Sequence, residues 1–358
     1  MRPTWAEISI SKFIRNIKRI KSIIAKKTKF LLVVKADAYG HGAVALAHFA
    51  EKESLCDFLG VSSIEEGIEL REKGIRLPII ILGSIYPTKN FPYLTKYNLT
   101  PTISSLMLLK ELVRYLRKTS SRMNIHIKLE TGMNRIGASE SVAMKMIEYI
   151  SSSPNIKIEG IYSHFSSADS DKSFTESQLE RFLRFTSSIK NINFIRHIAN
   201  SYATVSFPKS HLDMVRCGIA AYGSIDGFEE IMTLKTRVVF LKYIKKSSPV
   251  SYSKAFVAPK RIRVATIPVG YGDGYLRSLS NKALVMIRGR YAPVIGNITM
   301  DMTMIDVSDI KDIKIGDEVV ILGGGFDKIS IKQTAVKAQT IPYEITTLIT
   351  KRVRRIYK

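Results

Sequence analysis

The chain has 358 residues, of which 45% are hydrophobic, and a formal net charge of +24 at pH 7. This length allows one large domain plus a smaller one with a sizeable core, and no apolar run approaches the roughly 18 residues that a membrane helix needs. Two cysteines, Cys56 and Cys217, are too few for a disulfide framework or a cysteine-rich metal site.

The positive charge is spread along the whole chain, and no nucleic-acid recognition motif accompanies it. We therefore interpret most of it as solvated surface and expect no specific nucleic-acid partner. The N-terminus lacks the apolar segment of a secretory signal, so the expected location is the cytoplasm.

From residue 30 to about residue 223, strand-like and helix-like segments alternate, with a period of roughly 25 residues that is typical of βα units. The predicted strands are 30–34, 57–62, 78–82, 100–103, 124–130, 158–165, 194–200 and 213–222. Apolar residues three and four apart predict helices between them, and Ser63 with Glu66 and Ser173 with Glu176 fit helix-start capping boxes. This pattern predicts a closed (β/α)8 TIM-type barrel over residues 1–226.

Beyond residue 226 the predicted strands follow one another without long helices between them. They are 236–244, 261–269, 283–287, 302–307 and 318–322. Residues 227–358 are therefore predicted to form a mostly β domain, and residues 1–11 are a candidate to pair with it. Gly323, Gly324 and Gly325 predict a tight turn, because no phosphate-loop lysine follows them.

Lys35 directly follows the apolar run from Phe30 to Val34 and precedes the turn signals Gly40 and Gly42. An ammonium group at the boundary between core and cleft is costly to desolvate, so this position favours the neutral amine, which condenses with carbonyl groups. The alternative is a lysine whose charged end simply reaches solvent from a strand end.

Barrel enzymes carry their chemistry at the C-terminal ends of the strands. Besides Lys35, the residues at these ends are Arg135, His164, Asn200, Ser201, Arg216, Gly218 and Ile219. The hydroxyl of Ser201 and the amides of Gly218 and Ile219 suit a phosphate dianion. A Schiff-base lysine and a phosphate site on one rim indicate pyridoxal 5′-phosphate (PLP), whose aldehyde and phosphate need these two groups.

Longer motifs resemble those of the alanine racemase family, in the family's order and over nearly the whole chain. They are VVKADAYGHG, KLETGMNRIG, ANSYA, VRCGIAAYG, PVSYSKAF, IPVGYGDGYLR, VIGNITMDMTMIDV and IPYEITTLITKRV. The resemblance implies a PLP-dependent isomerase that interconverts L- and D-alanine through an external aldimine by a two-base mechanism and supplies D-alanine for peptidoglycan. It also implies a homodimer with active sites shared between subunits.

The resemblance further implies a role for each matching residue. Lys35 would carry the cofactor and act as the base on the D-alanine face, and Tyr252 of the other subunit would be the base on the opposite face. His164 and Arg216 are candidates to stabilise the Tyr252 phenolate. The implied cofactor contacts are Lys35, Tyr39, Arg135, Asn200, Ser201, Arg216, Gly218, Ile219 and Tyr343. The implied substrate contacts are Arg135, Met300 and the entrance residue Tyr271.

Alternation along 124–130 places Lys128 on the inner face of its strand. Some alanine racemases carbamylate the matching lysine, and we hypothesise the same here; the alternative is an ion pair of Lys128 with Glu130. Glu130 itself departs from the family's frequent aspartate, as Phe256 and Arg354 depart from its usual residues. The histidines show no shared metal-ligand spacing, so no metal is expected.

Two other functions are alternatives. A PLP-dependent amino-acid decarboxylase of the same fold would carry a glycine-rich phosphate loop and a cysteine-containing catalytic motif, and the sequence has neither. A basic nucleic-acid-binding protein would explain the charge but not the lysine, phosphate and tyrosine motifs. Serine remains open as a second substrate.

Overall fold

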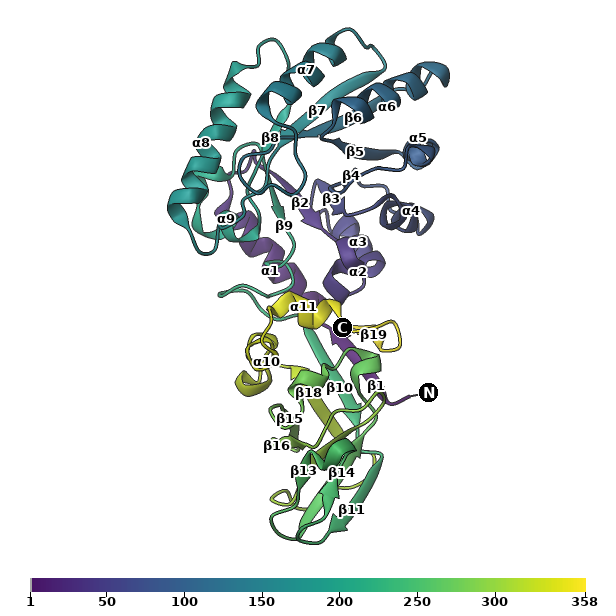
Figure 1. Cartoon of the computed structure of the whole chain (residues 1–358), viewed down its shortest axis with the longest axis vertical. Coiled ribbons are helices and arrows are strands. Elements are labelled where there is room, and N and C mark those ends of the chain that lie inside the picture. The colour runs from purple at the N-terminus through teal and green to yellow at the C-terminus, as the bar shows by residue number, and fades with distance from the viewer. Residues whose placement is uncertain (1) are drawn as a thin grey trace. The chain divides into compact units, whose positions relative to one another are not determined.

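The structure is a computed structural model that describes residues 2–358 (Figure 1). The chain forms two compact units. Residues 17–38 and 43–221 make the first, which we call the barrel unit. Residues 2–16, 39–42 and 222–358 make the second, which we call the β unit.

The barrel unit contains eight parallel strands in the order β8-β7-β6-β5-β4-β3-β2-β9. Their bounds are β2 (Lys29–Val33), β3 (Phe58–Val61), β4 (Ile79–Ile81), β5 (Leu99–Ile103), β6 (Met123–Lys128), β7 (Ile156–Tyr162), β8 (Ile195–His197) and β9 (Met214–Cys217). The two edge strands meet where the amide of Asp213 donates to the carbonyl of Arg196 at 3.1 Å. The ring is therefore nearly closed, which confirms the predicted barrel.

Helices lie outside this ring of strands (Figure 1). They are α1 (Ile10–Ile23), α2 (Lys35–Gly40), α3 (Ala43–Lys52), α4 (Ile64–Glu72), α5 (Phe91–Lys96), α6 (Leu106–Lys118), α7 (Glu140–Ser151), α8 (Lys172–Ser188) and α9 (Ser201–Ser206). Ser63 caps α4 by accepting the amide of Glu66, as its motif predicts. The predicted cap at Ser173 is wrong: α8 is capped two residues earlier, because Asp171 is a strong cap and accepts the amide of Phe174.

The β unit is built on a nine-stranded sheet in the order β11-β14-β17-β16-β15-β18-β10-β1-β19. Its strands are β1 (Thr4–Ile8), β10 (Met232–Arg237), β11 (Phe240–Ile244), β14 (Ile262–Ile267), β15 (Leu284–Ile287), β16 (Arg290–Ile295), β17 (Thr303–Asp306), β18 (Glu318–Gly323) and β19 (Arg354–Tyr357). A small pair, β12 (Pro249–Val250) and β13 (Phe256–Val257), and the helices α10 (Ile331–Ala338) and α11 (Pro342–Thr347) complete the unit.

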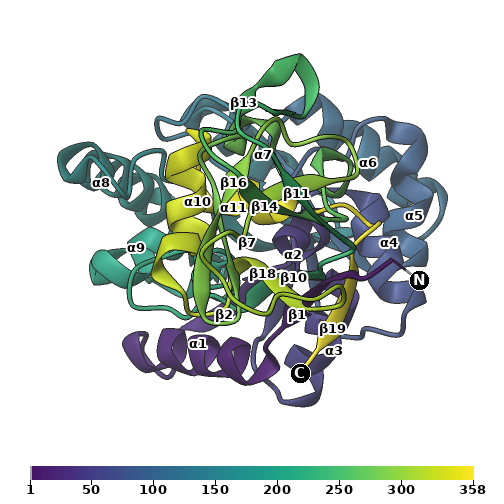
Figure 2. The ribbon, with the colours of Figure 1, turned by 90° about the horizontal axis from the view of Figure 1, so that it is seen from below.

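The two ends of the chain are neighbours in this sheet. β1 pairs with β10 in antiparallel and with β19 in parallel orientation, and Figure 2 shows β1 and β19 side by side. The strand predicted over 236–244 is in fact two strands, because β10 pairs with β18 whereas β11 pairs with β14. Within residues 2–358, no helix combines the length and the apolar character needed to cross a bilayer.

Candidate active site

Lys35 lies at the start of an unusual turn. β2 ends at Val33, and residues 36–39 then adopt φ values between 51° and 55°, the left-handed region that costs non-glycine residues roughly 1–2 kcal/mol each. The Glu66 carboxylate accepts the amide of Ala36 at 2.8 Å and so holds the turn from α4. Backbone strain that surrounding contacts maintain is typical of functional sites. Here the strained turn fixes the backbone position from which the Lys35 side chain extends.

Lys35 belongs to a cluster of cations in the barrel unit. Burial and the nearby Arg135 lower the pKa of Lys35. Lys128 is 5% exposed, its amine lies 5.5 Å from the centre of the Tyr162 ring, and burial together with Arg216 and Arg135 lowers its pKa to about 8. Because these positive groups repel one another, the cluster favours a bound anion.

Arg216 on β9 is 4% exposed, and within residues 2–358 its hydrogen-bond partners are two backbone carbonyls and two imidazoles. Its terminal nitrogens donate to the carbonyl of Ser163 at 2.8 Å, the carbonyl of Ile198 at 3.2 Å, His197 Nδ1 at 3.0 Å and His164 Nδ1 at 3.1 Å. Burial lowers the pKa of Arg216 to about 10. Burial and Arg216 hold the pKa of His164 well below its ordinary value, so His164 is a neutral imidazole.

The loop after β6 carries the exposed Arg135 and is organised by Glu130. The Glu130 carboxylate accepts the amide of Gly132 at 2.6 Å. Burial would raise the pKa of Glu130, but hydrogen bonds from the amides of Asn134 and its neighbours lower it. Within residues 2–358 Glu130 makes no ion pair with Lys128, so the alternative partner predicted for this lysine is not found.

The ends of β8 and β9 bring the predicted phosphate-site residues together. Ser201 is 4% exposed, and its hydroxyl oxygen accepts the amides of Gly218 at 3.1 Å and Ala220 at 3.4 Å. The Asn200 side chain accepts the amide of Ala203 at 3.0 Å and so caps the N-terminus of α9. The motif did not predict this structural role. Ile219 is half-buried in the same turn.

The β unit holds the predicted tyrosines in two settings. The rings of Tyr39 and Tyr343 meet edge to face at 6.4 Å, and Tyr39 also packs on Tyr222 at 5.4 Å. The chain beside Tyr39 approaches α11 so closely that a Cβ at Gly40 would lie 2.0 Å from the carbonyl oxygen of Thr346. Only glycine fits there.

Three other predicted residues of the β unit have large exposed side chains. Tyr252 is 72% exposed, Met300 is 53% exposed and Tyr271 is 44% exposed. Two phenols and one thioether side chain of this size, uncovered in a single chain, are typical of a surface that another molecule covers. Within residues 2–358 no group of three or more His, Cys, Asp or Glu side chains is placed to hold a metal ion.

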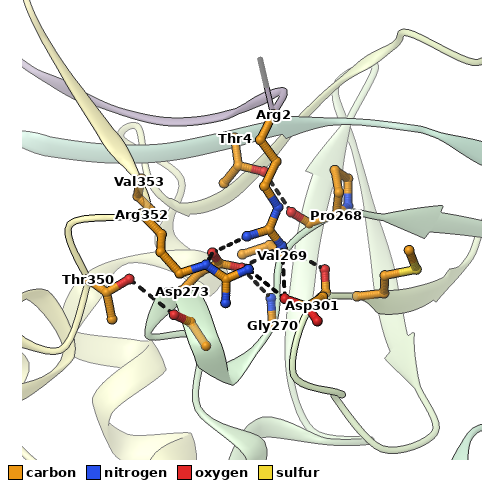
Figure 3. A network of polar contacts seen from close by, with 12 residues as sticks. Arg2, Thr4, Pro268, Val269, Gly270, Asp273, Asp301, Thr350, Arg352 and Val353 are labelled. Carbon is orange, nitrogen blue, oxygen red and sulfur yellow. Dashed lines mark hydrogen bonds and ion pairs between the residues drawn. The ribbon is translucent and has the colours of Figure 1, made fainter.

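The segments that carry Tyr271 and Met300 are held by an ionic network that the sequence did not predict (Figure 3). Asp273 and Asp301 share the guanidinium groups of Arg2 and Arg352. Two backbone hydrogen bonds also join these segments. The amide of Tyr271 donates to the carbonyl of Thr299, and the amide of Gly272 donates to the carbonyl of Met300. Asp273 lies in the motif IPVGYGDGYLR and Arg352 in the motif IPYEITTLITKRV, but the motifs do not show that the two side chains form an ion pair.

A TIM-type barrel with a cluster of cations around a lysine, followed by a mostly β unit, defines a class of barrel enzymes joined to a β domain. Two family models divide this chain between them: "Alanine racemase, N-terminal domain" matches residues 8–226 and "Alanine racemase, C-terminal domain" matches residues 231–357. The chain belongs to the alanine racemase family.

Similar proteins match over the full length. An alanine racemase of Halothermothrix orenii is 42% identical over 371 residues, covering 100% of this chain and 97% of the relative. One of Clostridium tetani is 42% identical over 376 residues, covering 100% and 96%. Among solved structures, alanine racemase of Clostridium difficile 630 superposes with a TM-score of 0.95 at 33% identity, covering 100% of this chain and 96% of that one. A Bacillus anthracis alanine racemase with bound L-Ala-P gives 0.93 at 31% identity, covering 100% and 95%.

Proposed function

We propose that this chain interconverts L- and D-alanine with PLP by a two-base mechanism, as a homodimer with shared active sites, and so supplies D-alanine for peptidoglycan. The observation that carries the proposal is the lowered pKa of Lys35 within the cation cluster. A lysine that is more readily neutral at physiological pH can bond to an aldehyde and can accept a proton.

The residues of the barrel unit fit this cofactor by their charge. Lys35, Lys128, Arg135 and Arg216 concentrate positive charge, and within residues 2–358 the hydrogen bonds of Arg216 go to carbonyl oxygens and imidazoles. A phosphate and a substrate carboxylate would supply the negative charge. When bound, the cofactor withdraws electrons from the substrate and so acidifies its Cα proton. By the family resemblance, the phosphate end would be held by Tyr39, Ser201, Tyr343 and the amides of Gly218 and Ile219. Asn200 would be a further cofactor contact, and Arg216 would face the ring nitrogen.

The chain's own groups then move the protons. Lys35 would accept or donate the Cα proton on one face, and Tyr252 from the partner subunit would do so on the other. Arg216 scarcely gives up its proton, so it would leave the ring nitrogen unprotonated and limit side reactions. Arg135, the amide of Met300 and Tyr271 would orient and admit the substrate. Serine is the closest competing substrate because it adds only a hydroxyl group.

The exposure of Tyr252 supports its contribution to a partner's site. A base for proton transfer must be shielded from bulk water, whereas this phenol is 72% exposed in one chain. A second copy that covers Tyr252 would provide the shielding and would also cover Met300.

We also propose that Lys128 is carbamylated. Its pKa of about 8 leaves an appreciable fraction of neutral amine at physiological pH, the form that reacts with carbon dioxide. The resulting carbamate would place one negative charge among Arg135, Arg216 and Lys35, and so would relieve their repulsion.

The proposal is tested by chiral analysis of L-alanine incubated with the PLP-supplied protein, together with borohydride reduction and peptide mapping. We expect D-alanine to form and the label to lie on Lys35. Lys35→Ala should abolish both results, whereas Tyr252→Phe should keep the label and lose most of the turnover. An unlabelled Lys35, or carbon dioxide release in place of racemisation, would reject the proposal.

A further inference from the structure

A line of buried hydrogen bonds leads from Arg216 to the outside of the barrel. Arg216 Nη1 lies 3.0 Å from His197 Nδ1, His197 Nε2 lies 2.8 Å from His126 Nδ1, and His126 Nε2 lies 3.2 Å from Glu159 Oε2. Both imidazoles are completely buried, whereas the side chain of Glu159 is 23% exposed. The line therefore begins at a buried cation and ends at a carboxylate that reaches solvent.

Only one direction of donation satisfies every bond in this line. A guanidinium can only donate, so His197 Nδ1 must accept and its hydrogen must lie on Nε2. That hydrogen points at His126 Nδ1, so His126 also carries its hydrogen on Nε2. An ionised carboxylate can only accept, and Glu159 takes this last hydrogen. Both histidines are thus neutral and in the same tautomer.

The charges around the line agree with this assignment. Burial lowers the pKa of His126, and burial and Arg216 hold that of His197 well below its ordinary value. Burial would raise the pKa of Glu159, but hydrogen bonds from His126 and Asn124 lower it. Tyr162 also packs on the line, and its ring stacks on His197 at 4.7 Å and 12°.

The fold contains two local features that make the line possible. Pairing between β6 and β7 shifts so that Ile125 faces Ile158 but His126 faces Gly160, which leaves Glu159 as the extra residue of a β-bulge. Bulges re-aim side chains, and here the bulge places Glu159 beside His126. A Cβ at Gly160 would lie 2.4 Å from the His126 ring, so only glycine leaves room for it.

We propose that Glu159 is a positioning residue for Arg216: as the acceptor at the end of the line, it holds both histidines in the Nε2–H form and so keeps His197 Nδ1 open to Arg216. The proposal rests on the proposed function, in which Arg216 faces the ring nitrogen of PLP. Without an acceptor at position 159, His126 can change tautomer and turn a hydrogen toward His197. His197 must then turn its own hydrogen toward Arg216, and the bond is lost.

The direct test is nitrogen-15 NMR of histidine-labelled protein, with and without PLP, in which ring shifts distinguish the two tautomers. Contacts to the Tyr162 ring identify His126 and His197 among the six histidines. We expect the Nε2–H form for both rings in the wild type and in Glu159→Gln, whose amide oxygen still accepts. In Glu159→Leu we expect His197 to lose the Nε2–H form. An Nδ1–H ring in the wild type, or unchanged tautomers in Glu159→Leu, would overturn the proposal.

The functional consequence is measured with PLP bound. Glu159→Leu should lower kcat/KM on the order of tenfold and shift the pH at which the visible band of the cofactor changes, whereas Glu159→Gln should stay within about threefold. Asn124→Ala is the matched control, because it removes the 3.2 Å bond to the other carboxylate oxygen and leaves His126 its acceptor. An equal loss in this control would contradict the proposal.

Two further outcomes separate this inference from the proposed function. The expected tautomers in a protein that neither binds PLP nor racemises alanine would leave the hydrogen-bond line intact and reject the function. Racemase activity in a protein whose two histidines have the opposite tautomers would support the function and reject the proposed role of Glu159. If Glu159→Leu fails to fold, the wild-type tautomers and Glu159→Gln still decide the matter.

Discussion

Asp273 accepts both terminal nitrogens of Arg2, at 2.5 Å and 3.0 Å, although its own side chain is only 1% exposed. It also accepts the amide of Gly270 at 3.0 Å, and Arg352 Nε lies 3.5 Å from the same carboxylate (Figure 3). One buried carboxylate thus joins the beginning of the chain, the segment that carries Tyr271, and a segment near the end of the chain.

Removing this charge should destabilise the β unit strongly. Asp273→Asn keeps the shape but removes the charge that binds Arg2 and Arg352. Both arginines are partly exposed and lie beside Asp301, so we expect a loss of about 1.5–3 kcal/mol, typical of a hydrogen bond to a charged group. Denaturant unfolding measures the loss. Asp226→Asn is the control, because its ion pair with Lys332 is exposed and should be worth less than about 1 kcal/mol. Equal losses in the two variants would show that Asp273 is not a structural anchor.

Much of the barrel could be predicted because strands such as β2 and β4 are short apolar runs. Ile79–Ile81, for example, is wholly buried and its pattern is unambiguous. The split into β10 and β11 could not be predicted, because it depends on which distant strands, β18 and β14, offer hydrogen bonds. Such pairing is a property of tertiary structure.

The candidate active site likewise combines features that the sequence predicts with features that depend on tertiary structure. Lys35 stands out in the sequence because an apolar strand precedes it, but its left-handed turn uses Ala36 and Ala38, residues that carry no local signal for positive φ. The bond between Arg216 and His197 could not be foreseen either. It joins residues on neighbouring strands through side-chain geometry that periodicity does not encode.

Carbamylation of Lys128 predicts that activity depends on carbon dioxide. Thorough removal of bicarbonate should lower the turnover of the wild type several-fold, and carbon-13 bicarbonate should restore it and give a carbamate signal in NMR. Lys128→Ala should lose the signal, whereas Lys337→Ala should keep it, although burial and Lys328 also lower the pKa of Lys337. A signal that survives Lys128→Ala would place the carbamate elsewhere.

An unmodified Lys128 predicts a different pH dependence of stability. Its folded pKa of about 8 lies below the ordinary value of 10.5, so between these values the unfolded chain binds more protons. The free energy of unfolding, relative to that of Lys128→Met, should then rise with pH from about 8 to about 10.5, by up to roughly 3 kcal/mol. Unfolding curves of both proteins across this range measure it, and a flat difference would favour the modified side chain.

Glu7 on β1 predicts sensitivity to acid. Burial would raise its pKa, but bonds from Lys358, Trp5 and Lys235 lower it from 4.5 to about 2. Its stabilisation is therefore complete above about pH 4.5 and is lost as the pH falls toward 2. Solvent screens these groups, so we expect only about 1 kcal/mol.

Unfolding of Glu7→Gln against the wild type tests this. The two proteins should differ at pH 6 and converge at low pH, whereas Glu111→Gln, whose pair with Arg114 lies on the surface of α6, should follow the wild type throughout. A difference that persists at pH 2 would mean that Glu7 acts by packing and not by its charge.

The exposed Tyr252 makes the proposed sharing of active sites between two subunits testable by mixing subunits. Lys35→Ala and Tyr252→Phe homodimers each lack one base in every site, so both should be nearly inactive. A mixed dimer has one site that lacks both bases and one that combines the intact Lys35 of one subunit with the intact Tyr252 of the other. Unfolding and refolding the two variants together in equal amounts makes half of the dimers mixed, so about one quarter of wild-type activity should return. Refolding each variant alone is the control, and activity no greater than theirs would show that each subunit supplies both bases to its own site.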